Sequence, residues 1–133
     1  MKRLVLDASA MVTLLESRPG AESVEETIHL AMAGKVELLM SVVNLGEVYY
    51  TIWRGRGALA AQKALAEVSQ LPIEFVSIDS GRALLAAEFP ARRVLRYPDS
   101  FAAALAKELK AALLTGDKDF AAVAEEIEII WTA

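Results

Sequence analysis

The chain has 133 residues, 55% of them hydrophobic and 24% charged, which predicts one folded domain and argues against disorder. It contains no cysteine and one histidine, which excludes disulfide frameworks, thiolate or histidine-rich metal sites and cysteine nucleophiles. The net charge of −4 disfavours a basic nucleic-acid coat protein. No apolar run reaches the roughly 20 residues of a membrane span, and the N-terminus does not resemble a secretory signal. We therefore expect a cytoplasmic protein.

Short β-rich segments alternate with longer alanine- and leucine-rich segments along the chain. In chain order, the pattern predicts a strand at 3–6, helices at 11–16 and 21–33, a strand at 36–40, helices at 42–53 and from after residue 57 to about 69, a strand at 73–78, a helix at 80–88, an irregular stretch at 90–98, a helix at 99–109, a strand at 112–114, a helix at 120–126 and a strand at 127–131. Ser9, Ser41, Asp79 and Asp99 are the predicted helix starts. Strands separated by helices need crossover connections, so we predict a mostly parallel sheet.

Four acidic residues from distant parts of the chain are expected at the carboxyl edge of this sheet. Asp7 and Asp117 follow strands, Asp99 begins a helix, and Glu47 lies in the helix after the second strand. Ligands of open parallel sheets bind outside the carboxyl ends of the strands. Carboxylates held close together repel one another, and a hard divalent cation offsets that repulsion. The pattern therefore indicates metal-assisted hydrolysis, which suits a phosphodiester substrate.

Each acidic residue also has a structural interpretation. Asp99 in Pro-Asp-Ser is an ordinary helix start, and Asp117 and Asp119 suit a turn. Glu47 suits a solvated helix face. Asp7 is the strongest candidate for a functional residue, because an acid closes an apolar strand there and small residues follow it.

Four segments resemble the acidic motifs of PIN-domain nucleases in their order and spacing: Leu6–Ala10 (LDASA), Val43–Val48 (VNLGEV), Tyr97–Ala106 (YPDSFAAALA) and Leu114–Phe120 (LTGDKDF). Together they span nearly the whole chain, and the resemblance is closest to the small VapC-like toxins of prokaryotic toxin–antitoxin pairs. It implies a single PIN-like domain over residues 1–133, an α/β fold with a twisted, mostly parallel sheet and helices on both faces. Pro98 and Ser100 depart from the residues that are common at their positions in this family.

The resemblance also implies an activity and a set of site residues. The activity is that of an endoribonuclease dependent on one or two Mg²⁺ or Mn²⁺ ions, and such toxins are usually homodimers held inactive by a VapB-like antitoxin. The catalytic, metal-ligating acids would be Asp7, Glu47, Asp99 and Asp117, with Asp119 as a further metal ligand. Polar groups that orient these acids would be Asn44, Thr115 and Ser9.

Contacts with RNA beyond the metal ions would need basic residues. The group that precedes Asp99 is the better candidate: Arg92, Arg93 and Arg96. Arg18, Arg54 and Arg56 are further candidates, and all six also suit a solvated surface. An aromatic and aliphatic set is expected either to bind a partner or to pack between two helices: Tyr49, Tyr50, Trp53 and Leu59.

Three other functions remain open at this point. A phosphoacceptor receiver-type domain fits the length, but its site needs an acidic pair after the first strand, and Ala8 follows Asp7. A non-catalytic interaction module of the same fold would not need all four acids. A nuclease acting on DNA or flap substrates would need elements for holding duplex DNA that so short a chain has little room for.

Overall fold

The computed structural model describes residues 1–133 and centres on a five-stranded sheet with strand order β3-β2-β1-β4-β5. The strands are β1 (Lys2–Leu6), β2 (Val36–Ser41), β3 (Ile73–Val76), β4 (Ala112–Thr115) and β5 (Ile129–Trp131). Every neighbouring pair is parallel, which confirms the predicted sheet. The helices are α1 (Ala8–Leu15), α2 (Ala21–Met32), α3 (Val42–Arg56), α4 (Ala58–Val68), α5 (Ser80–Ala91), α6 (Tyr97–Leu109) and the 3₁₀ helix η1 (Lys118–Val123).

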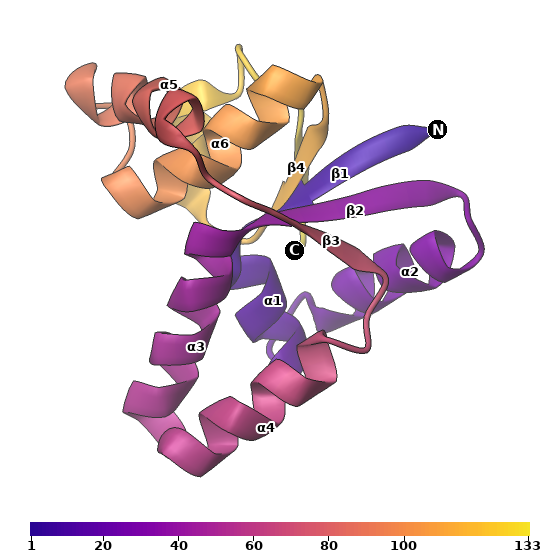
Figure 1. Ribbon diagram of the computed structural model, residues 1–133. Coiled ribbons are helices and arrows are strands. Elements are labelled where there is room, and N and C mark those ends of the chain that lie inside the picture. The colour runs from indigo at the N-terminus through magenta and orange to yellow at the C-terminus, as the bar shows by residue number, and fades with distance from the viewer.

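Helices cover both faces of the sheet because strands are added first on one side of β1 and then on the other. From β1 the chain adds β2 and β3 on one side, and it then returns to add β4 and β5 on the other. Crossovers between parallel strands are right-handed, so the reversal carries the later helices to the opposite face. One face packs against α1 to α4, and the other against α5, α6 and η1 (Figure 1). None of the helices is both long and apolar enough to cross a bilayer.

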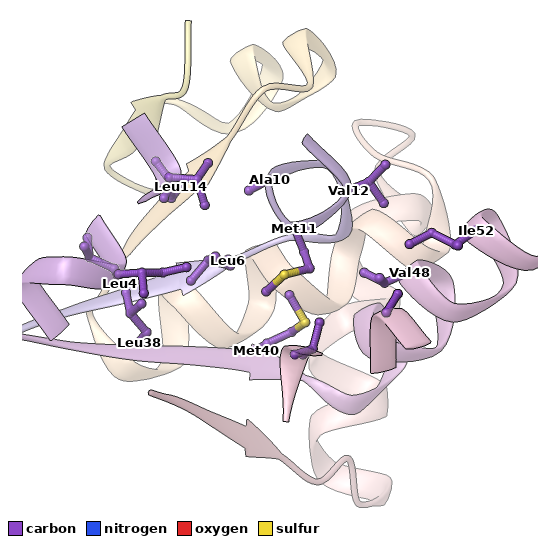
Figure 2. Packing of buried hydrophobic residues seen from close by; sticks show 14 of the residues in the cluster. Leu4, Leu6, Ala10, Met11, Val12, Leu38, Met40, Val48, Ile52 and Leu114 are labelled. Atoms are coloured by element: carbon purple, nitrogen blue, oxygen red, sulfur yellow. The ribbon is translucent and has the colours of Figure 1, made fainter. Parts of the chain in front are cut away.

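The central strands supply alternating side chains to two separate hydrophobic cores. In β1, Leu4 and Leu6 join the core under α1 to α4, whereas Val5 joins the core under α6. Figure 2 shows the first of these cores, with Met11 of α1 and Met40 of β2 between the sheet and α3. Because both faces of β1 are buried, the strand is apolar at consecutive positions. The apolar run ends at Leu6, and the first acid, Asp7, follows it.

The first helix begins earlier than predicted. It starts at Ala8, and its N-cap is Asp7, whose Oδ1 accepts a hydrogen bond from the Ala10 N–H at 2.9 Å. The prediction that Ser9 caps this helix is therefore wrong, because the aspartate carboxylate already accepts the hydrogen bond that a cap supplies. The predicted caps Ser41 and Asp79 are confirmed, since each accepts a hydrogen bond from the first turn of its helix.

The last long helix also begins earlier than predicted. Its N-cap is Arg96 and its first residue is Tyr97, so Asp99 lies inside the first turn and the prediction that Asp99 is the cap is wrong. Proline is accommodated in a first turn because its missing N–H would have no helical partner there. Pro98 therefore lies within the first turn of α6 and does not delay its start. Pro90 likewise lies within the last turn of α5, so the irregular stretch is shorter than predicted.

Candidate active site

The acidic edge lies beside β1 and β4, where the order of the strands reverses. Leu6, the last residue of β1, pairs with Leu114 of β4. Asp7 directly follows β1, and Thr115 is the last residue of β4. The Thr115 hydroxyl donates to Asp7 Oδ2 at 2.6 Å, which joins the two strand ends. In open α/β sheets this reversal opens a crevice at the carboxyl ends, so the location suits a binding site.

The Asp7 carboxylate is held by donors from three residues. The Ala10 N–H and the Ser9 hydroxyl donate to Oδ1 at 2.9 and 2.8 Å, and the Thr115 hydroxyl donates to Oδ2. Asp7 is only 4% exposed. Burial raises the pKa of Asp7 from 3.8 to about 6, although the hydrogen bonds from Thr115, Ala10 and Ser9 favour the charged form and the Asp117 charge adds to the rise. This pocket therefore fixes the orientation of a carboxylate that is costly to ionise.

A second group of carboxylates lies beside this pocket and is called here the open cluster: Asp99, Asp117 and Asp119. One carboxylate oxygen from each residue lies within 4.8 Å of the other two. Asp117 caps η1 by accepting from the Asp119 N–H at 2.9 Å, and its own N–H donates to the Thr115 hydroxyl at 3.0 Å. The turn after β4 thus connects the open cluster to the Asp7 pocket.

Asp99 reaches the open cluster from α6 and is largely buried. Burial raises its pKa, the Arg96 charge opposes that rise, and the Asp117 and Asp119 charges add to it. Its one ion pair is with Arg96, whose Nε–H donates to Asp99 Oδ2 at 3.3 Å. No other cation forms an ion pair with an acid of the open cluster.

Glu47 approaches the same edge from α3, where Asn44 fixes its position. The Asn44 amide donates to Glu47 Oε1 at 2.7 Å and to the Pro98 carbonyl at 3.1 Å, which connects α3 to the start of α6. The Asn44 Oδ1 atom is buried with no donor from the protein. Burial raises the pKa of Glu47, the Asn44 hydrogen bond opposes the rise, and the Asp99 charge adds to it.

The residues at this edge fit a hard divalent cation. The open cluster supplies only oxygen donors, as Mg²⁺ and Mn²⁺ prefer, and one exposed guanidinium is the only cation paired with its three carboxylates. Asp7 and Glu47 lie outside the group of oxygens within 4.8 Å. Their pKa values nevertheless respond to the charge of Asp117, so they belong to the same electrostatic site.

The three candidate RNA-binding arginines occupy different environments. Arg92 forms a double hydrogen bond to Glu126 at 3.1 and 3.2 Å, so its charge is compensated away from the acidic edge. Arg93 is exposed and forms no ion pair. Arg96 forms an ion pair with Asp99 of the open cluster. The sequence analysis did not predict this ion pair, although residues three positions apart at a helix start are close enough to form one.

A family model for the PIN domain matches residues 4–126. The chain belongs to the PIN-domain family. The match covers every acid of the edge, and it argues against the receiver-type interpretation, as does Asp79, whose carboxylate caps α5. No curated protein sequence gives a significant match to the chain.

Solved structures of toxin–antitoxin proteins share the fold of this PIN domain at low sequence identity. VapBC from Salmonella typhimurium, solved bound to DNA, has a TM-score of 0.79 at 16% identity, covering 100% of both chains. VapBC2 from Rickettsia felis, bound to a DNA fragment from its promoter, has a TM-score of 0.76 at 16% identity, covering 96% of this chain and 97% of that one. VapC20 from Mycobacterium tuberculosis, described as a toxin that cleaves the sarcin–ricin loop, has a TM-score of 0.73 at 18% identity, covering 90% and 94%.

Proposed function

We propose that this PIN domain is a metal-dependent endoribonuclease that hydrolyses RNA phosphodiester bonds with one or two Mg²⁺ or Mn²⁺ ions. The observation that carries the proposal is the open cluster of carboxylates beside a buried, oriented Asp7 at the point where the strand order reverses. Membership of the PIN family supports nuclease chemistry. The description of VapC20 as a toxin that cleaves the sarcin–ricin loop supports RNA as the substrate.

The residues at this edge would have different roles in the proposed reaction. Asp99, Asp117 and Asp119 would hold the ion, with Asp7 and Glu47 as the neighbouring carboxylates. When bound, the cation supplies positive charge that acidifies a water molecule and stabilises charge on phosphate oxygens. Ser9 and Thr115 keep Asp7 in one orientation, and Asn44 does the same for Glu47. The one histidine, His29, is exposed on α2, so no imidazole serves as a general base here.

We also propose that the protein is the toxin of a VapBC-like pair and forms a homodimer, with a VapB-like antitoxin as its partner. The VapBC structures that share the fold support this proposal. So does an exposed apolar surface on α3 and α4, where Tyr50 and Trp53 are each 47% exposed and Leu59 is 79% exposed. A cleft of about 460 Å³ beside this surface is lined by residues of α1, α3 and α4, Leu15, Ile52 and Lys63 among them.

Cleavage of a mixed RNA pool by the purified full chain tests the proposal. We expect cutting with Mg²⁺ or Mn²⁺, none with EDTA, and none by Asp7→Asn. Asp79→Asn is the matched control, because Asp79 caps α5 with the same 2.9 Å hydrogen bond by which Asp7 caps α1. Its activity should equal that of the wild type.

Three outcomes would count against the nuclease. They are cutting in EDTA, full activity in a folded Asp7→Asn protein, and an equal loss in the Asp79→Asn control. An intact protein that cuts no RNA under any condition would favour one of the two other functions left open, a non-catalytic interaction module with a PIN fold or a nuclease acting on DNA or flap substrates.

A further inference from the structure

Arg96 is the one basic side chain that the protein places against the acidic edge. Its Nε lies 3.3 Å from Asp99 Oδ2, and the Arg96 side chain is 71% exposed against 10% for that of Asp99. The other arginine and lysine ion pairs involve acids outside the edge. The guanidinium therefore covers the solvent side of a nearly buried carboxylate.

The main chain at Arg96 is fixed by hydrogen bonds, whereas the charged end of its side chain has few contacts. The Arg96 carbonyl accepts hydrogen bonds from the Ser100 N–H at 3.1 Å and from the Ser100 hydroxyl at 2.8 Å, and Ser100 is fully buried. The guanidinium donates only its Nε–H, so both Nη groups are without a hydrogen-bond partner in the protein. An arginine can present these two groups to a phosphate as a planar fork.

The ion pair also depends on the charge of the open cluster. Carboxylate oxygens of Asp117 and Asp119 lie within 4.8 Å of an Asp99 oxygen, so the guanidinium paired with Asp99 is attracted by three neighbouring carboxylates rather than by one. A divalent cation among the same carboxylates would repel the guanidinium and compete with it for the Asp99 carboxylate. Each cation should therefore weaken the binding of the other.

We propose that Arg96 is an exchangeable counter-cation, which neutralises Asp99 while no divalent ion is bound and turns to a phosphate of the RNA substrate once the ion displaces it. The exchange at Asp99 involves only residues of this chain, and the phosphate contact rests on the proposed nuclease function. Arg96 would thus position substrate, and Asp99 would have a charge partner in both states.

The first test is a calorimetric titration of Mn²⁺ into the full-length protein without RNA. Arg96→Gln should bind Mn²⁺ about 3- to 10-fold more tightly than the wild type, because a competing positive charge is gone. Arg93→Gln is the matched control, because it removes an arginine charge three residues from Arg96, and Arg93 forms no ion pair. The Mn²⁺ affinity of this variant should equal that of the wild type. Unchanged or weaker binding by Arg96→Gln, with unaltered thermal stability, would overturn the exchange.

The second test measures retention of a labelled, random-sequence single-stranded RNA pool by proteins that also carry Asp7→Asn, in the presence of Mn²⁺. Adding Arg96→Gln should weaken retention by about tenfold and reduce the salt dependence by roughly one phosphate contact. Adding Arg3→Gln instead, which removes an exposed arginine near the amino end of β1, should change neither. Arg96→Lys should recover part of the loss, since it keeps the charge without the fork.

The two tests separate the possible failures. Equal retention by Arg96→Gln and its parent, or no retention by the parent itself, would overturn the phosphate contact. A wild type that cuts no RNA while both binding results hold would overturn the nuclease and leave the exchange at Asp99 standing.

Discussion

Asp7 and the three carboxylates of the open cluster lie at the same edge of the sheet but form two groups with different environments. Asp7 receives hydrogen bonds from a backbone N–H and two hydroxyls, and its acceptors are satisfied within the protein. The open cluster brings three carboxylates together and offers them one exposed guanidinium. The first group is held by the fold, whereas the second depends on charge that comes from outside it.

This difference separates orientation from charge compensation. Hydrogen bonds fix where the Asp7 carboxylate points, but they do not offset the cost of ionising it in a buried pocket, as its raised pKa indicates. In the open cluster, the free-energy cost is the repulsion between neighbouring carboxylates. A cation bound at the edge would relieve both costs, so changes in the two groups should have distinguishable consequences.

The largest effect is expected in the open cluster. Asp99→Asn should reduce metal-dependent RNA cleavage by about 100-fold or more, because it removes one of the negatively charged ligands proposed to hold the ion. The measurement is initial cleavage rate at saturating Mn²⁺, with Asp79→Asn as the control. A folded Asp99→Asn protein that cleaves within a few-fold of the wild type would show that the open cluster is not the metal-binding half of the site.

The next effect concerns stability and pH in the Asp7 pocket. An acid whose pKa is raised from 3.8 to about 6 contributes stability that is fully present below pH 3.8 and is lost as the pH rises through 6. Asp7→Asn should therefore be more stable than the wild type at pH 8 in EDTA, by about 2–3 kcal/mol. The gain should shrink towards zero at pH 4.

Urea unfolding of both proteins across this pH range measures the difference directly. Asp79→Asn, which alters an exposed cap, controls for the loss of a carboxylate at a helix start. A stability difference between Asp7→Asn and wild type that does not change with pH would mean that Asp7 titrates normally in the folded protein.

A smaller effect is expected from the donor that links the strand ends. Thr115→Val keeps the shape of the side chain but removes the 2.6 Å hydrogen bond to Asp7 and the acceptor of the Asp117 N–H. It should cost about 2 kcal/mol at pH 8 and less at pH 4, because only the bond to Asp7 depends on the charge of that carboxylate. Thr132→Val is the matched control, because Thr132 is a buried threonine with no side-chain hydrogen bond to an acid. Equal losses in the two variants would indicate lost packing rather than a lost contact to a charge.

The smallest effect is expected far from both groups. Arg92→Gln breaks an exposed ion pair with Glu126 and should lower stability by about 0.5 kcal/mol without changing cleavage. Unfolding and cleavage assays on the same preparation test this. A large loss of cleavage would place Arg92 in the RNA path, as the sequence alone allowed, and would weaken the special position given to Arg96.

The sheet and its acidic edge could be predicted because they depend on patterns that are local in the sequence. Buried parallel strands are continuous apolar runs, and an acid that closes such a run, as Asp7 does, is visible without a structure. The strand order places Asp7 and Asp117 at one edge, which is why residues far apart in the chain could be named together.

The errors and omissions arise where two local signals compete or where contacts cross between elements. Ser9 and Asp7 are both good caps, and sequence alone does not say which carboxylate or hydroxyl meets the Ala10 N–H. The Asn44 contact to the Pro98 carbonyl joins residues 54 positions apart and has no sequence signal. The partners of Arg92 and Arg96 differ for the same reason, since Glu126 approaches the first from another part of the chain.

The most direct test of the metal site is the anomalous diffraction of a crystal of this protein grown with Mn²⁺. We expect a peak at the open cluster, about 2 Å from carboxylate oxygens of at least two of Asp99, Asp117 and Asp119, with the Arg96 guanidinium moved away from Asp99. A Mn²⁺ ion at full occupancy elsewhere, with no peak at the acidic edge and the Arg96–Asp99 ion pair intact, would contradict the assignment of this edge as the metal-binding active site.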